Sequence, residues 1–136
     1  MRIPRALYDE IVAHALADEH EVCGLVAGRD GTATRALPVR NAAEHPARTY
    51  EMDPMDQHRA FTDVEDTGED LLAIYHSHPP VGAYFSETDM RMAYTEDGEH
   101  PLWPGTLYIV VGLTPHGVKT FEIADHAAIE VELELV

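Results

Sequence analysis

The chain is poor in cysteine, in basic residues and in long apolar runs. Cys23 is the only cysteine among the 136 residues, so no disulfide can form within the chain and a reducing compartment is allowed. Lys119 is the only lysine. No apolar run approaches the roughly 20 residues that a membrane-spanning helix requires, and no apolar secretory segment follows the first residues. These shortages predict a soluble cytoplasmic protein without a membrane partner.

Charge of one sign dominates the composition. The chain has 25 Asp and Glu residues against 9 Lys and Arg residues, which gives a formal net charge of -16 at pH 7. Such a surface repels nucleic-acid phosphates, so we expect no DNA or RNA partner. The acidic surface is compatible with a basic protein partner, with adaptation to high salt, or with a solvated face that binds nothing, and the sequence leaves these three interpretations open.

Hydrophobic periodicity predicts an α/β (α+β) fold in a single domain spanning residues 1–136, with a curved, mixed, largely antiparallel sheet flanked by helices. The expected helices cover residues 5–17, 54–64 and 86–94. The expected strands cover residues 22–28, 32–39, 49–52, 71–75, 107–113, 118–123 and 128–136, and the expected turns and loops include residues 29–31, 79–85 and 114–117. The continuous apolar run 71–75 is typical of a central strand that is buried on both faces.

The segment His76-Ser77-His78 follows that apolar run and carries the main signal for chemistry. Alternate residues of an extended backbone point to the same side, so the two imidazoles share one face. Neutral imidazole nitrogens bind zinc, and Asp89 is a candidate third ligand that leaves a fourth position free for water. Two histidines satisfied by backbone groups at a strand end are the plain alternative, and the downstream aspartate favours the metal.

The segment Ser86-Glu87-Thr88-Asp89 has two interpretations. A serine followed three residues later by an acid matches the capping box, which is common at helix starts and needs no chemistry. A cap does not exclude a site, because Asp89 in the first helical turn can face the two histidines with Ser86 close by.

A zinc hydrolase also needs a general base that takes a proton from water and returns it to the leaving amine. Glu21 directly precedes the strand predicted over residues 22–28, beside the small residues Cys23 and Gly24. This position makes Glu21 a candidate, but periodicity alone does not favour Glu21 over Glu19.

Three motifs together resemble the JAMM (MPN-plus) metallopeptidase family in its single-domain prokaryotic form, and the resemblance covers almost the whole chain. These motifs are, in order, Glu21-x-Cys23-Gly24, His76-Ser77-His78-Pro79 and Ser86-x-x-Asp89. The resemblance implies a cytidine-deaminase-like fold and a Zn²⁺ cofactor. It also implies the roles of five residues: His76, His78 and Asp89 as zinc ligands, Glu21 as the general base, and Ser86 as the hydrogen-bond donor to the oxyanion.

The same resemblance implies the partner. Single-domain members of the family act on ubiquitin-like β-grasp proteins, including sulfur carriers. One branch removes a cysteine from the C-terminus of a sulfur carrier, and another cleaves isopeptide bonds to ubiquitin-like modifiers. A flexible glycine-rich tail suits a narrow channel and an extended binding mode. The sequence does not choose between a peptide and an isopeptide bond, and it does not give the oligomeric state.

Two further residues and two competing functions complete the expectations. Cys23 lacks the context of a nucleophile and suits a small buried position, while Phe85 stands where many family members have proline; both are candidates for lining the substrate pocket. A catalytically inactive MPN-type scaffold that binds protein partners is the main alternative function, and the complete five-residue set argues against it. A DNA-repair-associated relative with His-Asn-His is disfavoured by Ser77 and by the net charge.

Overall fold

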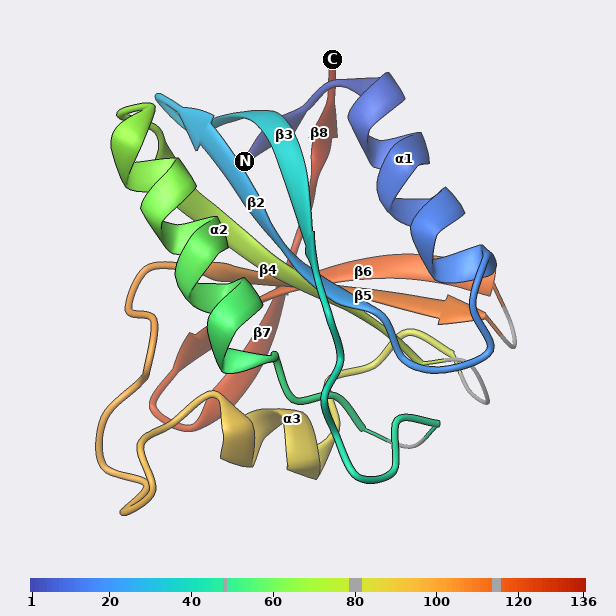
Figure 1. Ribbon diagram of the computed structural model, residues 1–136, viewed down its shortest axis with the longest axis vertical. Helices are drawn as coiled ribbons and strands as arrows, with labels where there is room; N and C mark the ends of the chain where they lie inside the picture. The colour runs from blue at the N-terminus through green and yellow to red at the C-terminus, as the bar shows by residue number, and fades with distance from the viewer. Residues whose placement is uncertain (48, 79–81, 114–115) are drawn as a thin grey trace.

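One eight-stranded sheet organises the chain, and helices pack on both of its faces (Figure 1). The computed structural model describes residues 1–47, 49–78, 82–113 and 116–136. The helices are α1 (Arg5–Leu16), α2 (Pro54–Asp66) and α3 (Glu87–Met92). The strands are β1 (Arg2–Ile3), β2 (Cys23–Arg29), β3 (Thr32–Val39), β4 (Asp70–His78), β5 (Leu107–Leu113), β6 (His116–Ala124), β7 (Ala127–Val131) and β8 (Glu134–Leu135).

The order of the strands shows that the sheet is curled. It runs β7-β6-β5-β4-β2-β3-β1-β8, with parallel pairs at β4–β5, β1–β3 and β1–β8 and antiparallel pairs elsewhere. The outer strands of a flat eight-stranded sheet lie about 34 Å apart, since neighbours are about 4.8 Å apart. Only residues 132 and 133 separate β7 from β8, and that link spans about 11 Å at most. The two edges therefore approach each other, which confirms the predicted curved, mixed and largely antiparallel sheet.

Side chains of β4 alternate between two hydrophobic clusters, one on each face. Tyr75 belongs to the cluster that lies under α1. Ile74 belongs to the other cluster, which includes Ala60 of α2 and against which Met90 of α3 packs. Figure 1 shows α1 on one side of the sheet and α2 and α3 on the other. Because successive side chains of a strand alternate, the even-numbered residues at the end of β4 face α2 and α3.

Two sequence predictions of strands are wrong. Residues 49–52 form no strand but a single bridge between Met52 and Asn41. The side chain of Asn41 donates a hydrogen bond to the Thr49 carbonyl and accepts one from the Glu51 amide. These backbone groups are therefore not available to pair with a neighbouring strand. The expected edge strand over 128–136 is two strands, β7 and β8, because the curl of the sheet lets the chain cross from one edge to the other.

Most element boundaries agree with the sequence predictions to within two residues. The predicted turn at 29–31 is confirmed: Asp30 and Gly31 both have positive φ, 52° and 76°, as a two-residue type I′ hairpin requires. Strand β1 was not predicted. Pro79 of the His-Ser-His-Pro motif, the rest of 79–81 in the predicted loop, and 114–115 of the predicted turn lie outside the described residues. Among the described helices, none is both long and apolar enough to cross a membrane.

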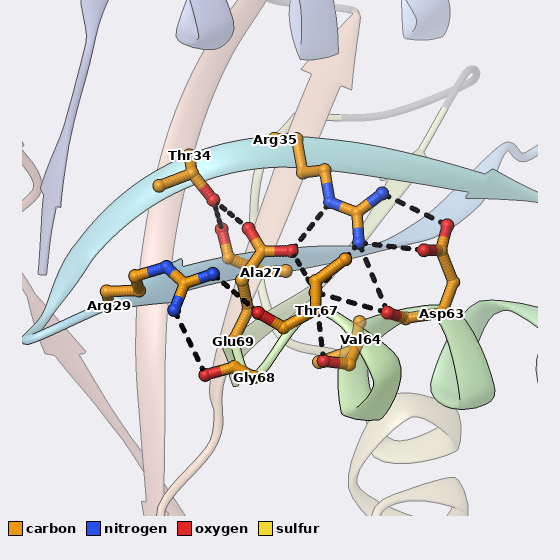
Figure 2. Close-up of polar contacts among 9 residues, drawn as sticks. All are labelled: Ala27, Arg29, Thr34, Arg35, Asp63, Val64, Thr67, Gly68 and Glu69. Carbon is orange, nitrogen blue, oxygen red and sulfur yellow. Dashed lines mark hydrogen bonds and ion pairs between the residues drawn. The ribbon is translucent and has the colours of Figure 1, made fainter.

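A polar network joins the end of α2 to β3 and to the start of β4 (Figure 2). Its centre is Glu69, whose side chain is only 6% exposed and accepts hydrogen bonds from Arg35 Nε at 2.8 Å and Thr67 Oγ1 at 2.6 Å. The Thr34 hydroxyl also donates to Glu69, and Arg35 pairs with Asp63 at 3.0 Å. These hydrogen bonds, first those from Thr34 and Thr67 and then that from Arg35, lower the pKa of Glu69 to about 2.

We expect Glu69→Gln to lower the free energy of unfolding by an amount that depends on pH. A carboxylate whose pKa is lowered from 4.5 to about 2 on folding stabilises the protein above pH 4.5, and this contribution disappears as pH falls toward 2. The difference in the free energy of unfolding between parent and variant, measured by urea unfolding, should therefore shrink over that range. Exposed Glu65, changed to Gln, is the control. A difference that stays constant with pH would contradict this account of Glu69.

Candidate metal centre

The end of strand β4 places two imidazoles side by side on the face covered by α2 and α3. His76 is fully buried and His78 is 5% exposed. Their Nε2 atoms lie 3.1 Å apart. The rings share one face of the strand, as the one-residue spacing predicts. β2 pairs with residues 70–76 of β4, and β5 pairs with residues 73–78, so His76 lies in a stretch of β4 that is paired on both sides.

Helix α3 brings Asp89 to the two histidines. Its Oδ2 atom lies 3.1 Å from Nε2 of His76 and 3.1 Å from Nε2 of His78. The same oxygen accepts the Ser86 backbone amide at 3.0 Å, and Ser86 Oγ accepts the Asp89 amide at 3.0 Å. The capping box predicted from the sequence is therefore present, and it fixes the Asp89 carboxylate at the point where the imidazoles meet.

Glu21 reaches the same point from the residues just before β2. Cys23 pairs with His76 in the antiparallel β2–β4 ladder, and continuing this register by two residues places Glu21 opposite His78. Glu21, His76 and His78 each offer a ligand atom, all within 4.8 Å of one another. Glu21 is 4% exposed whereas Glu19 is exposed, so the structure separates the two acids that periodicity did not separate.

The donor atoms fit a zinc ion. In a tetrahedral zinc site with ligands at 2.0–2.1 Å, neighbouring donor atoms are about 3.3 Å apart. The two imidazole nitrogens and the Asp89 oxygen form a triangle with sides of 3.1 Å, and two nitrogens with one carboxylate oxygen are a donor set that zinc accepts. Glu21 Oε1 is buried and has no hydrogen-bond partner among the described residues, so it is free to bond to a water or substrate group beside the triangle.

Burial and mutual contact shift the pKa of every ionisable group in this cluster. Burial raises the pKa of Glu21 to about 7, with Asp89 adding to the rise and His78 opposing it. Burial lowers the pKa of His76 and outweighs the opposing contact with Asp89. For His78 the effect of burial is outweighed by the Asp89 carboxylate, so the pKa rises. Burial also opposes ionisation of Asp89, but contacts with the two histidines lower its pKa overall. The cluster thus holds an ionised Asp89 beside imidazoles.

Ser86 combines the cap with access to the cluster. It is half-buried at the N-cap of α3, and its hydroxyl oxygen accepts the Asp89 amide. A serine hydroxyl that accepts one hydrogen bond still has its own proton to donate. The capping role and a donor role toward a substrate oxygen are therefore chemically compatible.

The two candidate pocket residues lie in packed surroundings. Cys23 is fully buried, its thiol donates to the Val39 carbonyl at 3.3 Å, and burial raises its pKa to about 12. Such a thiol is inert, as the sequence indicated. Phe85 is half-buried and its ring packs against the rings of Tyr108 and Phe121, with centroids 5.3 and 5.7 Å away.

Glycines explain two close approaches around the cluster. At Gly24, a Cβ atom would lie 2.4 Å from the ring of Tyr75, so the glycine of the first motif makes room on the α1 face. At Gly112 in β5, a Cβ atom would lie 2.0 Å from the Ala83 backbone nitrogen. The absence of a side chain at Gly112 lets residues 82–83 lie against β5 on their way to Ser86.

Sequence reasoning missed three residues that contact the site. Tyr50 is buried and stacks on His76, with ring centroids 4.6 Å apart. The rings of Tyr84 and His78 pack edge to face, with centroids 5.1 Å apart. The Ser77 hydroxyl accepts the Val22 amide at 2.9 Å and so anchors the residue after Glu21. No spacing rule points to Tyr50 or Tyr84, since both come from loops. Ser77 served in the sequence analysis only as part of the motif, and its contact with Val22 was not predicted.

Comparisons with known proteins agree with this geometry. The model of the family described as prokaryotic homologs of the JAB domain matches residues 4–124. A CysO-cysteine peptidase of Mycobacterium tuberculosis is 33% identical over 136 residues, covering 96% of this chain and 87% of that protein. A desampylase of Haloferax volcanii is 35% identical over 119 residues, covering 82% of this chain and 78% of that protein.

A solved structure extends the agreement to the fold. The solution structure of a protein from Desulfitobacterium hafniense matches with a TM-score of 0.81 at 30% identity and covers 99% of this chain and 92% of that one. The family match spans most of the chain and confirms the resemblance drawn from the motifs. The chain belongs to the family of prokaryotic homologues of the JAB domain, the JAMM type.

Proposed function

We propose that this chain is a zinc-dependent peptidase or isopeptidase that cleaves at the C-terminal Gly-Gly tail of a ubiquitin-like β-grasp protein. The observation that carries the proposal is the 3.1 Å triangle of His76, His78 and Asp89 donor atoms with the buried, unpartnered carboxylate of Glu21 beside it. A scaffold that only binds partners has no use for a buried acid aimed at a metal site, since burying it costs free energy.

The side chains divide the work of hydrolysis. Zinc, when bound by His76, His78 and Asp89, supplies a Lewis acid and brings the pKa of a bound water near neutral. Glu21 accepts a proton from the attacking water and returns it to the leaving amine. The Ser86 hydroxyl donates a hydrogen bond to the oxygen of the scissile carbonyl as negative charge develops there. Each group is within the buried cluster or at its border.

The relatives supply the substrate class. The Mycobacterium tuberculosis relative is named for a CysO-cysteine substrate, and the Haloferax volcanii relative is named a desampylase. From these names and from the motifs we take a ubiquitin-like protein, either a sulfur carrier or a modifier, as the partner of this chain. The buried Cys23 thiol is free among the described residues, which suits the reducing cytoplasm as the compartment.

Two matched substrates test the proposal and show whether the chain cleaves a peptide bond or an isopeptide bond. One is a ubiquitin-like protein with a single cysteine added after its Gly-Gly end, and the other is the same protein joined through Gly-Gly to a lysine side chain. The zinc-loaded chain should release the Gly-Gly-ended protein from at least one of them, as measured by intact-mass spectrometry, and chelation should stop the release. Failure to cleave either substrate in the zinc-loaded form would contradict the proposed function.

A further inference from the structure

Asn41, the only asparagine in the chain, is half-buried two residues after the end of β3, and every donor and acceptor of its side-chain amide is hydrogen-bonded. Its Nδ2 donates to the Glu21 carbonyl at 2.9 Å and to the Thr49 carbonyl at 3.0 Å. Its Oδ1 accepts the Ala43 and Glu51 amides, each at 3.0 Å. An asparagine side chain has two donor protons and two acceptor lone pairs, so this residue has no hydrogen-bonding capacity left.

The first of these bonds holds the residue that carries the proposed general base. Glu21 precedes β2 and lies outside its ladder. Its backbone amide donates to the Pro46 carbonyl at 2.7 Å, and its carbonyl accepts from Asn41. The Glu21 Oε1 atom has no hydrogen-bond partner among the described residues. The position of the carboxylate therefore depends on the backbone, and Asn41 supplies one of the bonds that fix it.

The other bonds hold the residue that packs on a proposed zinc ligand. Asn41 binds the carbonyl before Tyr50 and the amide after it, on Thr49 and Glu51. Tyr50 lies between these two anchors and stacks on His76, with the ring planes 25° apart. One side chain therefore links the backbone of Glu21 to the loop that covers His76.

We propose that Asn41 is a positioning residue that sets the Glu21 carboxylate against the metal triangle and the Tyr50 ring against His76. This inference rests on the proposed function, because it assigns Asn41 to the same reaction. A loop anchor without any effect on the reaction is the competing interpretation. The two interpretations differ in what happens to turnover when the fold and the metal are retained.

Asn41→Asp separates them. Aspartate keeps the acceptor for the Ala43 and Glu51 amides, loses both donors and sets a carboxylate oxygen against the Glu21 carbonyl. We expect zinc content to be unchanged and kcat on the cleaved substrate to fall about 10²-fold with KM little changed, since a misplacement of about 1 Å costs that much. Asp53→Ala is the control, because it removes the N-cap of α2, and the hydrogen bonds of the Asp53 side chain go to the Met55 and Asp56 amides and to Arg40, not to Glu21 or Tyr50.

A double-mutant cycle identifies the residue through which Asn41 acts. In the Glu21→Gln background, Asn41→Asp should lower the residual rate much less than it does in the parent, because the part that acts through the Glu21 carboxylate is already lost, whereas independent effects would multiply in full. Multiplying effects, or an Asn41→Asp variant as fast as Asp53→Ala at equal thermal stability, would overturn the role of Asn41 while the proposed function stands. An inactive zinc-loaded parent would overturn the proposed function and this role with it.

Discussion

Glu21→Gln should keep its zinc and its fold and lose roughly 10²–10⁴ in turnover, the range that a general base contributes. Glutamine has nearly the same shape and fits the same buried position, but it cannot accept a proton. The loss should appear in kcat, because proton transfer belongs to the transition state and not to substrate binding. The measurement is the steady-state rate of cleavage of the ubiquitin-like substrate together with zinc content.

Glu19→Gln is the matched control for this variant. Glu19 is the acid that periodicity left open as the base, and in the structure it is exposed while Glu21 is buried. Its replacement should leave both turnover and zinc content at the parent level. If Glu19→Gln were the crippling change and Glu21→Gln nearly silent, the base would have been assigned to the wrong residue.

Ser86→Asp should fold, bind zinc and be almost inactive, with kcat lower by roughly 10²–10³ and KM little changed. Aspartate caps a helix as well as serine does, so the amide of Asp89 keeps an acceptor. An ionised aspartate has no proton to donate, and it adds negative charge where the substrate oxygen becomes negative. The variant therefore removes the proposed donor and keeps the cap.

Two controls separate the donor from the added charge. Ser86→Thr keeps both a capping oxygen and a donor proton and should retain most of the activity. Thr88→Asp places the same charge two residues along in the first turn of α3 and should cost far less than Ser86→Asp. Normal turnover by Ser86→Asp would reduce Ser86 to a helix cap and leave the chemistry to Glu21 and the metal.

Local rules account for the parts of the site that the sequence predicts. The period of an extended strand places His76 and His78 on one face, and the capping box places Ser86 and Asp89 at the start of α3. These features depend on spacings of two and three residues. The order of the strands, by contrast, depends on packing and was not predicted. What the motif resemblance supplied was the choice of Glu21 over Glu19 as the base, which periodicity left open.

Long-range pairing accounts for what the sequence does not show. Glu21 lies opposite His78 only through the register of β2 on β4, and that register is a tertiary property. The sequence predicts a strand that includes Tyr50. In the structure the side chain of Asn41 hydrogen-bonds to the backbone on either side of Tyr50, and this segment is a loop whose Tyr50 ring covers His76. The division of 128–136 into β7 and β8 requires the curl of the whole sheet.

The zinc content of protein purified without chelator tests the central claim most directly. Three converging donor atoms predict about one zinc per chain by elemental analysis, with the fourth position open. His76→Ala and His78→Ala should each lower this content steeply, while Glu21→Gln and Ser86→Thr should keep it. A zinc content near zero in the parent, or full zinc in His76→Ala, would contradict the assignment of this cluster as a metal centre.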